Sequence, residues 1–310
     1  MKLLAVRGRL FKLILTTIIV ILTGGYVVVF HLAPHLILAP RKITDKTLLT
    51  YFNEIPSPAS NSYGYDEFNL SCADGVNLNG WFINANTPDP KGTLVFIHGI
   101  GGSKEFFVSR AQRYVNQGLN VVLFDLRAHG KSTGEYCTYG FFEKNDVEEL
   151  VKYIISKQGE KPIGLYGTSL GGAVALQAAS ICSDVDFVIV ESTFPSMEEV
   201  VFEYMKRLSG VQLSFISDWA LSAAGKKAGF DPEMVQPELA AGLIKQPALI
   251  VHGTADVHIP MALGKRNFDA LLSQDKTWLE IPGADHNSVV RVGGEAYLRK
   301  VDEFILRQLN

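Results

Sequence analysis

Residues 163–172, IGLYGTSLGG, place a Gly-x-Ser-x-Gly pattern directly between an apolar run and a stretch with helical pattern. The apolar run predicts a buried strand that ends at Tyr166, and the helix is expected to begin at Gly172. A serine on so sharp a strand-to-helix turn projects its hydroxyl into a cleft, and flanking glycines let strand and helix approach closely. A phosphate-binding loop, the competing interpretation, would carry a lysine after the glycines, and none follows here. The stretch therefore predicts that Ser169 is a nucleophile.

Apolar runs and helical patterns alternate on both sides of this turn, which indicates a parallel sheet covered on both faces. Two alternating segments come first and are joined by the turn Ala73-Asp74-Gly75-Val76, so we expect a β-hairpin there. The predicted strands are 67–72, 77–83, 93–97, 120–125, 163–166, 187–191, 248–251 and 278–281. The fold class is therefore α/β, with a mostly parallel sheet and helices on both faces.

The composition gives the size of the folded part and argues against nucleic acid and structural zinc as partners. The chain has 310 residues, of which 47% are hydrophobic, enough for one large α/β domain or two ordinary ones. Its formal net charge is -3, and its charges are mixed along the sequence, so no basic stripe suggests nucleic acid as a partner. Three scattered cysteines fit neither a zinc site nor a disulfide framework. They are interpreted as thiols, with one disulfide and a spare thiol as the alternative.

The N-terminal region differs from the rest. Residues 13–30 carry no charge and are followed by a still apolar stretch to residue 40, long enough to span a bilayer. Basic side chains precede the apolar stretch, and they would keep the N-terminus in the cytoplasm and the remainder outside it. These side chains belong to Lys2, Arg7, Arg9 and Lys12, and the later cations Arg41, Lys42 and Lys46 weaken the bias. A cleaved signal peptide and a buried or interfacial helix remain alternatives.

The predicted organisation is an anchor over 1–40, a linker over 41–65 and one domain over 66–310. The linker is expected because Pro, Ser, Asn and Gly are frequent between residues 50 and 65. No candidate catalytic residue lies in the anchor, so we expect anchor and catalyst to be separable. A helical segment over 194–237 interrupts the sheet strands and is expected to form a small cap, with extra scaffold helices as the alternative.

A serine nucleophile needs a base, and the position of each histidine selects one. His286 follows the last predicted strand in a loop at the carboxyl edge of the sheet, where ligand sites of such sheets lie. Asp256 follows the preceding strand and is predicted to orient the imidazole ring. Glu191 at the end of an earlier strand is the rival acid. Asp285 is disfavoured because it directly precedes His286, and the carboxylate of a sequence neighbour rarely pairs side-on with the imidazole ring.

A glycine-rich turn, His98-Gly99-Ile100-Gly101-Gly102, follows the strand at 93–97 and is expected to aim a backbone N–H at a developing oxyanion. The two donors would be the N–H groups of Ile100 and Leu170. A mere tight turn is the alternative. The polar stretch 125–132 is assigned to loop structure and not to catalysis.

Five motifs in order carry a family resemblance: His98-Gly99, 125–132 as Asp-x-Arg-x-His-Gly-x-Ser, 167–171 as Gly-x-Ser-x-Gly, 253–256 as Gly-x-x-Asp, and Asp285-His286. The set resembles the α/β-hydrolase superfamily, in particular its serine aminopeptidase-like and small-capped, membrane-associated branches. The resemblance covers about residues 66–310. It implies an eight-stranded sheet with an antiparallel second strand, a triad of Ser169, Asp256 and His286, and neither cofactor nor metal. Ile100 departs from the family, where a smaller or polar residue is common.

The expected activity is hydrolysis of an ester or thioester, with a small-molecule or lipid ester as substrate. A peptidase or amidase of the same fold and an inactive binding module are the alternatives. The oligomeric state is not readable from the sequence.

Overall fold

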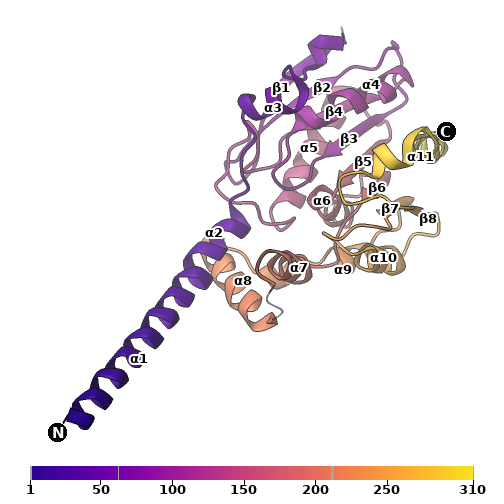
Figure 1. Cartoon of the computed structure of the whole chain (residues 1–310). Coiled ribbons are helices and arrows are strands. Elements are labelled where there is room, and N and C mark those ends of the chain that lie inside the picture. The colour runs from indigo at the N-terminus through magenta and orange to yellow at the C-terminus, as the bar shows by residue number, and fades with distance from the viewer. Residues whose placement is uncertain (1, 62, 211–212, 310) are drawn as a thin grey trace.

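The computed structural model describes residues 2–61, 63–210 and 213–309, and its eight strands form one sheet (Figure 1). The spatial order of the strands is β1-β2-β4-β3-β5-β6-β7-β8. β2 pairs antiparallel with β1 and with β4, and all other neighbours are parallel. The strands are β1 (Tyr65–Ser71), β2 (Asn77–Ile83), β3 (Thr93–Ile97), β4 (Asn120–Phe124), β5 (Ile163–Thr168), β6 (Phe187–Glu191), β7 (Ala248–Gly253) and β8 (Lys276–Ile281). The predicted fold class, including the antiparallel second strand, is confirmed.

Two hydrophobic clusters lie on opposite faces of the sheet because successive strand side chains point to opposite sides. In β3, Val95 and Ile97 join the cluster that includes α5 and α6, whereas Leu94 and Phe96 join the cluster that includes α4 and α11. The helices of the domain are α3 (Asp45–Phe52), α4 (Val108–Asn116), α5 (Glu143–Gln158), α6 (Leu170–Ala179), α7 (Met197–Ser209), α8 (Ser214–Ala228), α9 (Pro237–Ala241), α10 (Met261–Ala270) and α11 (Val289–Gln308). Short η segments are η2 (Pro58–Asn61), η3 (Lys104–Phe107) and η4 (Pro232–Met234).

A long helix extends from the domain at the N-terminal end of the chain (Figure 1). It consists of α1 (Lys2–Val27), a π-helical turn η1 (Val28–Leu32) and α2 (Ala33–Leu38). Its stretch from Phe11 to Leu38 has a mean hydropathy of 2.5 and is long and apolar enough to cross a membrane. The chain therefore carries an N-terminal apolar helix of the kind expected for a membrane anchor.

The last turn of this helix belongs to the folded domain. Leu38 is fully buried and Ile37 nearly so, both within the larger hydrophobic cluster. The carbonyl of Leu38 accepts a hydrogen bond from the N–H of Cys137 (2.8 Å), and that of Ile37 accepts one from the hydroxyl of Tyr139 (3.1 Å). The expectation of a separable anchor therefore does not extend to α2, because burial and hydrogen bonds join it to the domain.

The segments predicted as linker and cap have their own helices. Residues 41–65 include α3, whose first turn is capped by the Thr44 hydroxyl, which accepts a hydrogen bond from the N–H of Thr47 (3.3 Å). Between β6 and β7, residues 194–237 contain α7, α8 and η4. Residue 62 of the predicted linker and residues 211–212 of the predicted cap lie outside the described residues.

Candidate active site

Ser169 sits on the turn between β5 and α6 with backbone angles φ 54° and ψ -118°. Such a conformation is strained for a residue with a side chain and is typical of a nucleophile elbow. The neighbouring glycines explain how the chain tolerates the turn. A Cβ atom at Gly167 would lie 2.1 Å from the carbonyl oxygen of Gly171, and one at Gly171 would lie 2.0 Å from that of Ile97. Strand and helix therefore approach so closely that only glycine fits at both positions.

The structure brings together the three side chains that the sequence singled out. His286 Nε2 lies 3.0 Å from Ser169 Oγ, and His286 Nδ1 lies 2.8 Å from Asp256 Oδ2. His286 comes from the loop after β8, and Asp256 comes from the loop after β7. Because the carboxyl ends of parallel strands share one edge of a sheet, residues 117 positions apart meet there.

Asp256 is held as a carboxylate that accepts several hydrogen bonds. Its Oδ1 accepts from the N–H groups of His258 and Ile259, each at 2.9 Å, and His252 Nε2 lies 3.3 Å from its Oδ2. Burial by itself would raise the pKa of Asp256. The hydrogen bonds with His252, His286 and Ile259 outweigh burial and hold the pKa well below its ordinary value. The group is therefore ionised beside His286 at neutral pH.

The rival acid, Glu191, lies in a different cluster. Its carboxylate accepts hydrogen bonds from the hydroxyls of Tyr166 (2.6 Å) and Tyr297, and Arg110 Nη1 lies 3.5 Å from it. Glu191 lines the same cavity as Ser169, but its carboxylate is bound to these three partners and makes no contact with His286. The geometry thus favours Asp256 over Glu191 as the partner of the imidazole.

The glycine-rich turn lies directly against the nucleophile. A Cβ atom at Gly99 would lie 3.3 Å from Ser169 Cβ, so a side chain there would crowd the serine. Among the described residues, neither the N–H of Ile100 nor that of Leu170 donates a hydrogen bond to another group of the chain. This is compatible with the predicted role of the two groups as oxyanion donors, which stays a prediction.

Two histidines hold this turn, a function that the sequence assignment of 125–132 to loop structure missed. His129 Nε2 accepts a hydrogen bond from the N–H of Gly101 (3.1 Å), and its Nδ1–H donates to the carbonyl of Arg127 (2.9 Å). His98 Nε2 accepts from the N–H of Leu126 (3.0 Å). The signal in the sequence is that polar residues follow two successive predicted strands, at 98–102 and at 125–132.

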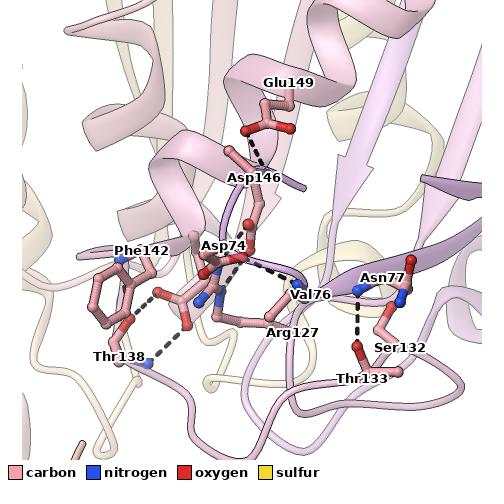
Figure 2. Close-up of polar contacts among 12 residues, drawn as sticks. Asp74, Val76, Asn77, Arg127, Ser132, Thr133, Thr138, Phe142, Asp146 and Glu149 are labelled. Carbon is pink, nitrogen blue, oxygen red and sulfur yellow. Dashed lines mark hydrogen bonds and ion pairs between the residues drawn. The ribbon is translucent and has the colours of Figure 1, made fainter. Parts of the chain in front are cut away.

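Arg127 anchors the same loop to the scaffold (Figure 2). Its guanidinium binds both carboxylate oxygens of Asp146 on α5, at 2.6 and 2.5 Å, and Asp74 in the β1–β2 turn at 2.9 Å. The ring of Phe142 lies 5.1 Å from the guanidinium carbon. A bidentate, buried ion pair fixes orientation better than a single contact. Arg127 therefore positions the backbone that carries His129.

His129 should make stability depend on pH. Burial lowers the pKa of His129 from 6.5 to about 3, so the ring is neutral in the folded protein at neutral pH. The unfolded chain binds a proton more readily, and stability from this group is lost as pH falls from 6.5 toward 3. We expect the free energy of unfolding to fall by about 2 kcal/mol between pH 7 and pH 5 through this group. Denaturant unfolding should show a smaller decrease for His129→Gln, and an equal decrease in both proteins would contradict the assignment.

Two cavities meet at Ser169. The first has a volume of about 540 Å³ and a mixed lining, in which the charged or polar side chains of Arg110, His258 and His286 stand among apolar ones. The second has a volume of about 210 Å³ and an apolar lining contributed mainly by α2 and α7. A reacting group at Ser169 can therefore extend into the larger, mixed cavity beside His286 or into the smaller, apolar cavity beside α2.

Known proteins resemble this chain in sequence and fold. The family model described as serine aminopeptidase, S33, matches residues 88–240. YqkD of Bacillus subtilis is 26% identical over 280 residues, covering 87% of this chain and 90% of that protein. The lysophosphatidylserine lipase ABHD12 of Danio rerio is 26% identical, covering 73% of this chain and 64% of that protein. The esterase Pf2001 of Pyrococcus furiosus superposes with a TM-score of 0.72 at 22% identity, covering 88% of this chain and 98% of that structure.

Proposed function

Since the chain belongs to the α/β-hydrolase superfamily, we propose that it is a serine hydrolase that cleaves ester or thioester bonds of acyl compounds. The observation that carries the proposal is the continuous series of contacts from Ser169 Oγ through His286 to Asp256. Ser169 is the nucleophile, His286 the general base and acid, and Asp256 the group that orients the imidazole. No step of this mechanism requires a metal or cofactor.

The contacts define the path of the proton. His286 Nδ1–H donates to Asp256, which leaves Nε2 free to accept the proton of the Ser169 hydroxyl. Ser169 Oγ then bonds to the carbonyl carbon, and the oxyanion that forms accepts hydrogen bonds from the N–H groups of Ile100 and Leu170. The leaving group departs with the proton from His286. Water, deprotonated by the same nitrogen, releases the acid from the acyl-enzyme.

An ester or thioester is favoured over an amide by the similarity to an esterase and a lipase and by the apolar cavity at Ser169. Peptide or amide hydrolysis is the second candidate, and the match to a family described as serine aminopeptidase supports it. Both reactions use the same triad, so the nature of the leaving group distinguishes them.

The proposal is tested with the purified full-length protein and a fluorophosphonate probe, which reacts with activated serines. We expect labelling of the wild type at Ser169 and none of Ser169→Ala. The same preparation should hydrolyse p-nitrophenyl esters faster than aminoacyl p-nitroanilides. Labelling that persists in Ser169→Ala would disprove the nucleophile assignment. Faster cleavage of the anilides than of the esters would identify the protein as a peptidase or amidase.

We further propose that the catalytic domain lies on the extracytoplasmic side of the membrane, because the cations at Lys2, Arg7, Arg9 and Lys12 precede the apolar stretch. A protease added to intact cells or spheroplasts is expected to reach the domain. The cations at 41, 42 and 46 follow the apolar stretch and favour the opposite orientation, so the protease experiment has to distinguish the two. Protection of the domain until the cells are lysed would reverse the proposed orientation.

A further inference from the structure

We propose that α2, the end of the N-terminal apolar helix, forms one wall of an acyl-chain site, so that the membrane helix takes part in substrate binding. The inference rests on the proposed function, because it takes Ser169 as the nucleophile. It goes further in stating which part of the substrate each cavity holds and which elements recognise it.

The cavity that would hold the acyl chain is built from two helices that are far apart in the sequence. From α2 it is lined by Ala33, Leu36 and Ile37, and from α7 by Val200 and Val201. Ser169 and Leu170 also line it, so the space reaches the proposed nucleophile. The hydroxyl of Tyr139, which also lines it, is engaged by the carbonyl of Ile37. Such a lining suits methylene groups and offers few partners for a polar group.

The position of His286 decides which half of the substrate enters this cavity. His286 lines the larger, mixed cavity and is absent from the lining of the apolar one. The leaving group takes its proton from His286 Nε2 and so must lie on the side of the larger cavity, which His286 lines. The acyl chain, on the other side of the scissile bond, is then directed into the apolar cavity beside α2.

The wall formed by α2 is held in place. The N–H of Cys137 and the hydroxyl of Tyr139 donate hydrogen bonds that fix the carbonyls of Leu38 and Ile37. Beyond α2, the Lys42 ammonium donates to the carbonyl of Ser132 (3.2 Å), in the loop that supports the oxyanion turn. These three hydrogen bonds tie the wall to the domain, and a site that discriminates chain length requires a wall held in a defined position.

The same helix connects the cavity with the bilayer. The apolar stretch Phe11–Leu38 has 28 residues, whereas about 20 residues span the hydrocarbon core. Its last turns can therefore stand at the membrane surface. There Phe30 stacks on Trp219 of α8 with ring centroids 6.2 Å apart, and Phe215 and Trp219 are exposed. Leu36 is 67% exposed while lining the cavity, so it marks the mouth on the membrane side.

The test compares Leu36→Trp with a matched control, Leu32→Trp. Both leucines are exposed on the same helix, at 67% and 50%, but only Leu36 lines the cavity. Full-length proteins in detergent micelles are assayed with p-nitrophenyl esters from acetyl to dodecanoyl. We expect the wild type to favour longer chains, and Leu36→Trp to lose about fourfold in relative kcat/KM for each methylene that is no longer buried. Leu32→Trp should keep the wild-type profile.

The possible outcomes separate the two proposals. Fluorophosphonate labelling of Ser169 shows that a variant is folded, and Ala33→Phe, on the same wall, replaces Leu36→Trp if the latter is not labelled. An unchanged chain-length profile in labelled variants, or an equal change in Leu32→Trp, would overturn the role of α2. Absence of labelling in the wild type would instead reject the nucleophile, and with it the proposed function.

Discussion

Ser169→Ala is expected to lower kcat for ester hydrolysis by about 10⁶-fold, the magnitude found when a nucleophile is removed from a serine hydrolase. The physical reason is that the oxyanion donors and the cavities remain but no acyl-enzyme can form. Ester hydrolysis by purified full-length protein, followed over long incubation, measures the residual rate. Ser109→Ala, an exposed serine on α4, is the matched control and should retain full activity.

The same experiment tests whether Ser169 and His286 act as a unit. His286→Ala alone should cost nearly as much as Ser169→Ala, because an unactivated hydroxyl is a poor nucleophile. The double variant should be hardly slower than either single variant, since the second substitution removes a group that no longer has a function. Losses that multiply in the double variant would mean that the two side chains act in separate steps, contrary to their 3.0 Å contact.

Asp256→Asn is expected to lower kcat by about 10⁴-fold without unfolding the protein. The amide can donate to His286 Nδ1, which favours the tautomer with the proton on Nε2. That nitrogen can then no longer accept the proton of Ser169. The substitution also removes the negative charge that stabilises the imidazolium. Activity and thermal unfolding of the purified variant are measured together, so that loss of the fold is distinguished from loss of catalysis.

Glu191→Gln is the matched control, since it makes the same carboxylate-to-amide change in the rival acid. We expect a much smaller loss of kcat, because Tyr166, Tyr297 and Arg110 are the partners of Glu191. A lower melting temperature is expected as well, since Arg110 would be left without the carboxylate that pairs with it in a buried site. The reverse ranking of the two variants in kcat would identify Glu191 as the acid.

Local pattern was sufficient for the predictions about the fold. The first two strands follow from alternating segments around a turn, the other six from continuous apolar runs, and the turn at Ser169 from residues adjacent in sequence, so none of these predictions needs long-range information. His286 and Asp256 were selected because each follows a strand, and parallel strands deliver their carboxyl ends to one edge. These inferences depend on the order of elements, which a sequence contains. The catalytic roles themselves remain predictions.

Only the tertiary structure shows which side chains support the active-site turn and which part of the N-terminal helix packs against the domain. Nothing in the sequence says that His129 contacts the N–H of Gly101, 28 positions away. Likewise, the pattern of residues 33–38 indicates the end of an apolar anchor, and only packing against α8 and the core places them beside Ser169. The sequence pattern of an apolar segment is the same whether lipid or protein covers its side chains. Its surroundings are set by the three-dimensional arrangement of distant elements and not by its neighbours along the chain.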